Sequence, residues 1–131
     1  KERLIVISPW LNLDAINFEF LNHLQNALNK NIDIFIIYGF GDKKNVEEKA
    51  LRQLNLIKKN AKKGRLYLHR RKDIHSKVLI CDDKYLVITS LNWLSFAGDP
   101  QRGSRIEDGI KTTNKEAVIK KTNEWLERIK N

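Results

Sequence analysis

Residues 74–93 read IHSKVLICDDKYLVITSLNW. Two apolar runs in this stretch, 75–81 and 85–90, are rich in β-branched residues, which is typical of strands. The polar tripeptide Asp82-Asp83-Lys84 lies between them and is typical of a tight turn. The stretch therefore predicts an antiparallel hairpin, and the hairpin decides which polar side chains become neighbours.

Four polar side chains of this hairpin are placed to converge. His75 and Lys77 are two residues apart, so they share one strand face, whereas Ser76 points the other way. Ser90 and Asn92 are likewise two apart at the end of the second run. Because antiparallel pairing brings the two sets to adjacent positions, the sequence predicts an imidazole, an ammonium, a hydroxyl and an amide in one place.

This group of side chains suits cleavage of a phosphodiester without a metal ion. A free imidazole titrates near pH 6.5 and is a competent nucleophile, while an ammonium and an amide N–H can hold phosphoryl oxygens. An attacking histidine also needs a carboxylate on its second ring nitrogen. We predict Glu107 for this role rather than Asp108, because Asp108 shares its expected strand face with Ile106 and Ile110.

The spacing of these residues resembles the signature of the phospholipase D superfamily, a His-x-Lys followed by Asp and by Gly-Ser-x-Asn. Here the sequence reads His75-x-Lys77, four residues, Asp82, six residues and Thr89-Ser90-Leu91-Asn92, so that Thr89 stands where the family has glycine. The residues that follow are similar to the continuation seen in bacterial members attached to helicase or ATPase modules. They are Asn92-Trp93-Leu94-Ser95, Gly98-Asp99 and Arg105-x-Glu107-x-Gly109.

The resemblance implies a role for each matching residue. His75 would form a phosphohistidine, Lys77 and Asn92 would hold the phosphate, Ser90 would support the site, and Glu107 would orient the histidine. The family's Asp is usually remote from the substrate, so the matching residue of the turn is expected to be structural. No cofactor and no metal ion are expected to take part.

The resemblance also implies an assembly. Family members work with two such motifs related by a two-fold axis, one histidine attacking and the other protonating the leaving oxygen. This chain has one motif, so we expect a homodimer with a shared active site.

The elements around the hairpin predict an α/β fold, and the resemblance makes it a phospholipase D-like mixed β-sheet sandwiched between helices. Alternation and apolar periodicity predict the boundaries. The first helix is expected to be capped by Asp14 and the last by a capping box of Thr113 and Glu116. The expected strands are 4–7, 32–38, 65–69, 75–81, 85–90 and 105–112, and the expected helices are 14–28, 46–57 and 113–129.

The chain is strongly basic, with a formal net charge of +9 and a sequence pI of 9.7. Such a surplus favours anionic partners, and we predict nucleic acid, DNA before RNA. Eight basic residues fall between 58 and 72 without an acid among them. Beside the motif, this run predicts a surface that follows a phosphate backbone, with Arg70, Arg71 and Lys72 as substrate-binding residues. By itself, the run is more typical of a solvated helix end and loop.

Residues 1–131 have the length of one domain, and the start at Lys1 without any methionine suggests a piece of a longer protein with possible helicase or ATPase domains. No apolar run approaches the ~18 residues of a membrane span, and the lone Cys81 fits a reducing compartment, so a cytoplasmic location is expected. No zinc spacing, glycine-rich phosphate loop or carboxylate cluster for magnesium occurs in the sequence.

Three functions are compatible with these patterns. The first is a metal-independent nuclease, the second a phospholipid or head-group phosphodiesterase, and the third a non-catalytic nucleic-acid-binding dimer. His69, which ends a predicted strand shortly before the motif, either faces the site or belongs to the solvated basic run.

Overall fold

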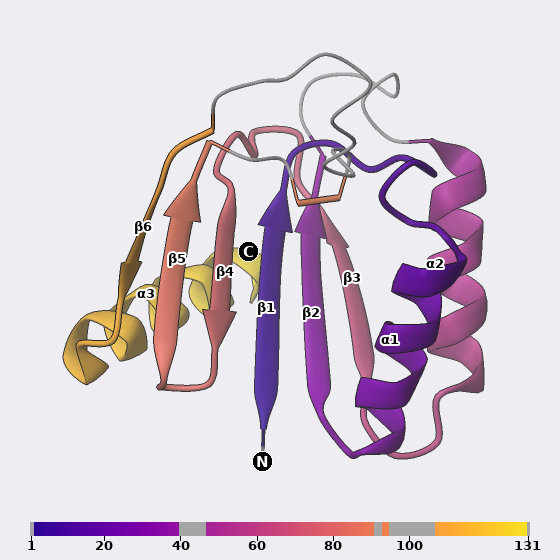
Figure 1. The fold of residues 1–131 in the computed structure, drawn as a ribbon, viewed down its shortest axis with the longest axis horizontal. Helices are drawn as coiled ribbons and strands as arrows, with labels where there is room; N and C mark the ends of the chain where they lie inside the picture. Colours follow the sequence, from indigo (N-terminus) through magenta and orange to yellow (C-terminus); the bar gives the residue numbers. More distant parts are fainter. Residues whose placement is uncertain (1, 40–46, 91–92, 95–106, 131) are drawn as a thin grey trace.

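The computed structural model describes residues 2–39, 47–90, 93–94 and 107–130 (Figure 1). Its described strands form one mixed sheet in the order β3-β2-β1-β4-β5-β6. Strands β1, β2 and β3 are parallel, and β1/β4, β4/β5 and β5/β6 are antiparallel. The elements are β1 (Arg3–Ser8), α1 (Phe18–Asn29), β2 (Asp33–Tyr38), α2 (Glu48–Asn60), β3 (Leu66–Arg70), β4 (Val78–Cys81), β5 (Tyr85–Thr89), β6 (Gly109–Thr112) and α3 (Lys115–Lys130).

Helices cover both faces of the sheet, which confirms the predicted α/β sandwich. Alternation along β1 divides its side chains: Val6 joins a core with α1 and α2, whereas Ile5 and Ile7 join a second core with α3. Figure 1 shows α3 behind the sheet and the other two helices in front of it. Among the described helices, none has the length and apolarity that crossing a membrane requires.

The predicted hairpin is confirmed, and its turn is hydrogen-bonded to the start of β1. Asp82 adopts a left-handed backbone with φ of 49°, which Asp tolerates better than most residues. Its Oδ1 accepts from the backbone N–H of Arg3 at 2.5 Å, and its own N–H donates to the Arg3 carbonyl at 2.9 Å. Asp82 is therefore a structural residue that joins the β4–β5 turn to the start of β1.

Both predicted helix caps were wrong. Asp14 lies in a turn in which the Asn12 side chain accepts its N–H, and α1 starts later, capped by Asn17, which accepts from Phe20 at 3.0 Å. At α3 the side chain of Asn114 accepts from the N–H of Ala117 at 3.0 Å. In both places an asparagine nearer the helix provides the acceptor that the first turn needs.

Two strands begin three or more residues later than predicted. β4 begins at Val78 rather than at 75, and its last partner on β1 is Ile7. β6 begins at Gly109, so Glu107 and Asp108 precede the strand, and the part of the predicted strand before them lies outside the described residues.

Candidate active site

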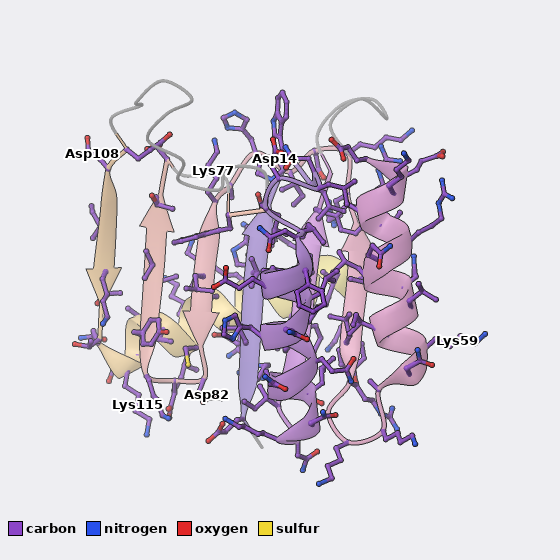
Figure 2. All side chains as sticks on the ribbon, turned by 45° about the vertical axis from the view of Figure 1, so that its right-hand side comes forward. Asp14, Lys59, Lys77, Asp82, Asp108 and Lys115 are labelled. Carbon is purple, nitrogen blue, oxygen red and sulfur yellow. The ribbon has the colours of Figure 1, made fainter. Side chains whose placement is uncertain are left out.

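Three of the described motif residues, His75, Lys77 and Ser90, lie at one edge of the sheet, the edge formed by the ends of the strands. The parallel strands end there, β4 begins there, and β5 ends there. Figure 2 shows Lys77 and Asp108 at this edge and Asp82 at the opposite one. His75 and Lys77 lie in the segment before β4, and the Lys77 carbonyl accepts from the N–H of Thr89 at 3.1 Å. The hairpin thus places the His-x-Lys segment beside the end of β5, as the sequence predicted, although not within a strand.

His75 and Lys77 line a cavity of about 320 Å³, a size typical of small ligand sites. The hairpin and α3 supply its described walls. Sequence reasoning missed the contribution of α3, although Lys121, Trp125 and Arg128 have the i, i+4, i+7 spacing of one helix face. The described lining residues are His75, Ser76, Lys77, Val78, Ile88, Thr89, Lys121, Trp125 and Arg128.

Ser90 is bonded to the segment that carries the predicted carboxylate. Its hydroxyl donates to Oε2 of Glu107 and accepts from the N–H of Asp108 at 3.1 Å. The backbone N–H of Ser90 donates to the Asp108 carbonyl at 2.9 Å. Ser90 and Glu107 therefore form one unit at the site edge, whereas the Asp108 side chain is exposed. The predicted role of Glu107 in orienting His75 stays a prediction.

Thr89 fits where the family has glycine because its partner in β6 is a glycine. Thr89 pairs with Gly109, and a Cβ on Gly109 would lie 3.2 Å from the Thr89 side chain. The Thr89 hydroxyl donates to the Asp108 carbonyl at 2.8 Å. The threonine thus adds a link to the same segment that Ser90 holds.

Asn92, the predicted amide of the site, lies outside the described residues. The chain just after it is anchored at the end of β1. The N–H of Leu94 donates to the hydroxyl of the fully buried Ser8 at 3.4 Å, and the Leu94 carbonyl accepts from Asn12 at 2.9 Å. The segment that follows the Thr89-Ser90-Leu91-Asn92 motif therefore returns to the same sheet edge as His75.

The sequence predicts that the basic run 58–72 forms one surface, and the structure contradicts this prediction. Strand β3 crosses the sheet between its two halves, so Lys58, Lys59, Lys62, Lys63 and Arg65 lie towards the edge opposite the site. Figure 2 shows Lys59 at that lower end of α2. Residues 70–72 alone reach the site edge.

Arg71 is largely used by the protein itself. Its guanidinium donates to both carboxylate oxygens of Asp73, at 3.1 and 3.0 Å, and to the backbone carbonyl of Arg128 at 2.6 Å. These hydrogen bonds hold the pKa of the Asp73 carboxyl below its usual range. Three of the five guanidinium donors are engaged in this way, so Arg71 as a substrate ligand stays a prediction.

Arg70, Lys72 and His69 line a neighbouring hollow of about 340 Å³ together with Arg71 and Asp73. His69 belongs to β3, where its Cα pairs with Ile37. The described walls of the His75 cavity do not include His69. Among the described residues, no cluster of three or more His, Cys, Asp or Glu side chains is arranged to hold a metal ion.

Comparison with known proteins relates the whole chain to one family. A family model described as "Cardiolipin synthase, PLD-like domain" matches residues 1–130. NucT from Helicobacter pylori is similar in structure, with a TM-score of 0.66 at 16% identity, covering 97% of this chain and 77% of NucT. Phosphatidylserine synthase from Haemophilus influenzae Rd KW20 gives a TM-score of 0.50 at 12% identity, and the match covers 95% of this chain but 32% of the synthase. A search of curated proteins gave no match.

Proposed function

The chain belongs to the phospholipase D superfamily, and from that premise we propose that it is a metal-independent phosphodiesterase domain that cleaves nucleic acid, DNA in the first place, through His75. The observation that carries the proposal is the cavity beside the hairpin, which contains His75 and Lys77 and has further cations from α3 in its wall. A nucleophile and cations in one cavity are the groups that phosphoryl transfer needs when no metal ion supplies the positive charge.

In the proposed reaction the imidazole of His75 attacks phosphorus, and the bond from phosphorus to the leaving oxygen breaks. A proton donor completes the leaving alcohol, and water then hydrolyses the phosphohistidine to release the second product and free His75. Lys77 offsets the charge on the phosphoryl oxygens, and Asn92 does so by its match to the family motif. No step requires an oxidant, a reductant or a cofactor.

Ser90 and Glu107 are proposed to support His75 rather than to react. Their mutual hydrogen bond and the contacts of Ser90 with the backbone of Asp108 supply a rigid carboxylate at the site edge. A carboxylate that is held in this way can fix the tautomer of a nearby histidine and stabilise the imidazolium.

The proton donor is proposed to be His75 of a second copy of the chain. Loss of an alkoxide without a general acid is slow, and the described cavity walls contain a single histidine. A two-fold dimer would bring a second imidazole to the site. The proposal therefore includes a homodimer with one shared active site.

The charge of the chain supports nucleic acid as the substrate. A net charge of +9 and three permanent cations around the cavity favour a polyanion. The second candidate is a phospholipid head-group reaction, which is favoured by the description of the matching family model and by the likeness to a phosphatidylserine synthase. We further propose that residues 1–131 act as one catalytic domain and that helicase or ATPase domains accompany it in a longer protein.

A single assay separates these candidates. The purified protein is incubated in EDTA with labelled single- and double-stranded DNA, with RNA, and with phosphatidylcholine vesicles. We expect cleavage of nucleic acid that the chelator does not stop, and loss of activity in His75→Ala but not in His23→Ala, which changes a surface histidine on α1. A rapidly quenched reaction should contain an acid-labile phosphoryl adduct on His75.

Several results would contradict the proposal. Activity that EDTA abolishes and magnesium restores would exclude the metal-independent mechanism. An adduct on another residue would remove His75 from its role, and turnover of vesicles alone would select the lipid reaction. Binding of DNA that survives His75→Ala, with no cleavage by the unmodified protein under any condition, would indicate a non-catalytic binding module.

A further inference from the structure

Helix α3 forms one wall of the His75 cavity with a face of defined chemistry. Lys121, Trp125 and Arg128 are spaced so that they follow one another along a single face of the helix, and all three line the cavity. Lys121 and Arg128, the two cations of this wall, are not part of the His-x-Lys motif. The family residues come from the hairpin and its continuation, whereas these two cations come from α3, which begins at Lys115.

Each side chain of this face has a contact that fixes its position. The Arg128 guanidinium lies over the ring of the buried Trp125, 4.4 Å from its centre, in a cation–π contact. The backbone carbonyl of Arg128 accepts from Arg71, which begins the segment that leads to His75. The Lys121 ammonium lies 3.2 Å from Glu124, and its side chain keeps about a third of its surface exposed. The cations are thus held at the wall and remain open to solvent.

The balance of charge in the cavity exceeds what one phosphodiester requires. Lys77, Lys121 and Arg128 carry positive charge, and no carboxylate occurs among the described lining residues, although Glu124 outside the lining already pairs with Lys121. A phosphodiester carries a single negative charge, which Lys77 beside His75 can offset. A second anion next to the scissile phosphate can therefore bind Arg128, and also Lys121 in exchange for its partly exposed pair with Glu124.

We propose that Lys121 and Arg128 bind a backbone phosphate that neighbours the scissile one, so that the site selects a polynucleotide over an isolated phosphodiester. The inference rests on the proposed function, and it names two residues outside the motif that determine substrate length. Arginine can grip phosphate with two N–H groups, and the ring of Trp125 limits the directions that Arg128 can take.

The test compares two substrates in the same variants. Bis(p-nitrophenyl) phosphate has one phosphate and no neighbour, whereas a single-stranded DNA oligonucleotide has many. Lys121→Met and Arg128→Met remove the charge and keep the aliphatic stem. The matched control is Lys120→Met, which removes a charge from the same helix, where Lys120 lines a separate hollow with Glu116 and Ile119.

We expect each variant to lower kcat/KM for the oligonucleotide by roughly tenfold, because a charged hydrogen bond to the second phosphate is lost. The loss in kcat/KM for bis(p-nitrophenyl) phosphate, which has no second phosphate, should be several times smaller. Lys120→Met should leave both values unchanged. The slope of log KM for the oligonucleotide against log salt should flatten by about 0.7 for each phosphate contact removed.

Equal losses on both substrates would overturn the inference, because they would mean that α3 supports His75 rather than a second phosphate. An unchanged kcat/KM for the oligonucleotide would overturn it as well. Failure of the proposed function is distinguishable. If the unmodified protein cleaves neither substrate, binding of a fluorescein-labelled oligonucleotide to the His75→Ala protein still tests Lys121 and Arg128, whose changes should weaken binding while Lys120→Met does not.

Discussion

The guanidinium of Arg71 donates a hydrogen bond to the backbone carbonyl of Arg128, 2.6 Å away. Arg128 lies in the last turn of α3, where carbonyl oxygens have no partner within the helix and the helix dipole is negative. Arg71 therefore caps α3 from a distant part of the sequence. It also holds Asp73 two residues before His75, so that one side chain ties the helix wall of the cavity to the segment that carries the nucleophile.

Replacing Arg71 should lower kcat even where the protein remains folded. Arg71→Ala releases the segment before His75 from α3, and a misplacement of about 1 Å at a reacting group can cost up to ~100-fold in rate. We expect a loss of about tenfold or more in kcat, with partial recovery in Arg71→Lys. Arg52→Ala, which removes an exposed cation of α2, is the control. A larger effect on KM than on kcat would show that Arg71 binds substrate directly.

The Arg71–Asp73 pair predicts a dependence of stability on pH. The pair lowers the pKa of Asp73 in the folded protein, chiefly through the hydrogen bonds from Arg71. Its contribution is therefore present above the unfolded pKa of about 3.9 and is lost as the pH falls through the lower folded value. The melting temperature of the unmodified protein should exceed that of Asp73→Asn at pH 6, and the difference should shrink below about pH 4. A difference that grows in acid would contradict this account.

Asp82 should matter for stability and not for catalysis. Asp82→Ala removes the acceptor for the Arg3 N–H and places alanine at a φ of 49°. We expect a loss of about 1–3 kcal/mol of unfolding free energy, and a smaller loss in Asp82→Asn, which keeps an acceptor and tolerates this backbone. Asp83→Ala, which breaks an exposed pair with Lys115, is the control. Denaturant unfolding measures all three. A fall in kcat of the folded protein would contradict the structural role.

Ser90 and Glu107 should behave as one unit. Ser90→Ala and Glu107→Gln each disturb the carboxylate at the site edge, so each should lower kcat, by about ten- to a hundredfold. The double variant should lose little more than the worse single one, because coupled residues are not additive. Asp108→Asn, in which the neighbouring exposed carboxylate is neutralised, should have a small effect. If Asp108→Asn is the more damaging change, then Asp108 rather than Glu107 orients His75.

Mixing subunits tests the shared site. His75→Ala protein is mixed with unmodified protein and allowed to exchange. If each site needs two histidines, activity should fall as the square of the unmodified fraction, to about a quarter at equal mixing with random assortment. If each chain carries a complete site, about a half should remain. In that case the general acid lies within the chain, and His69, near the same sheet edge, is the first residue to replace.

The hairpin was predictable because its signals are local. Alternation, a polar turn and two short motifs lie within twenty residues, and they placed His75 and Lys77 beside the end of β5. The start of β4 was misjudged because it depends on pairing with β1, which is far away in the sequence and whose last paired residue is Ile7. Where a strand begins depends on both of the strands that pair, and a single stretch of sequence shows only one of them.

The role of α3 was not predictable in the same way. Periodicity shows that Lys121, Trp125 and Arg128 share a helix face, but it does not show which cavity the face lines. That depends on packing of α3 against Ile5 and Ile7 at the centre of the sheet. The basic run was misread for a related reason: residues continuous in sequence were assumed to be continuous in space, and a five-residue strand separates them.

The central ladder between β1 and β4 has a consequence for how the chain acquires its structure. It joins Leu4 to Cys81, and the parallel strands β2 and β3 lie on the other side of β1. Contacts between such distant segments form slowly, because the entropy cost of closing a long loop comes before the contacts stabilise the chain. An emerging chain can assemble β1, β2 and β3 with α1 and α2 first, leaving Ile5, Ile7 and Ile37 without the cover that α3 later provides. Until the last helix is synthesised, that apolar face is the part of the chain most exposed to aggregation and to chaperones.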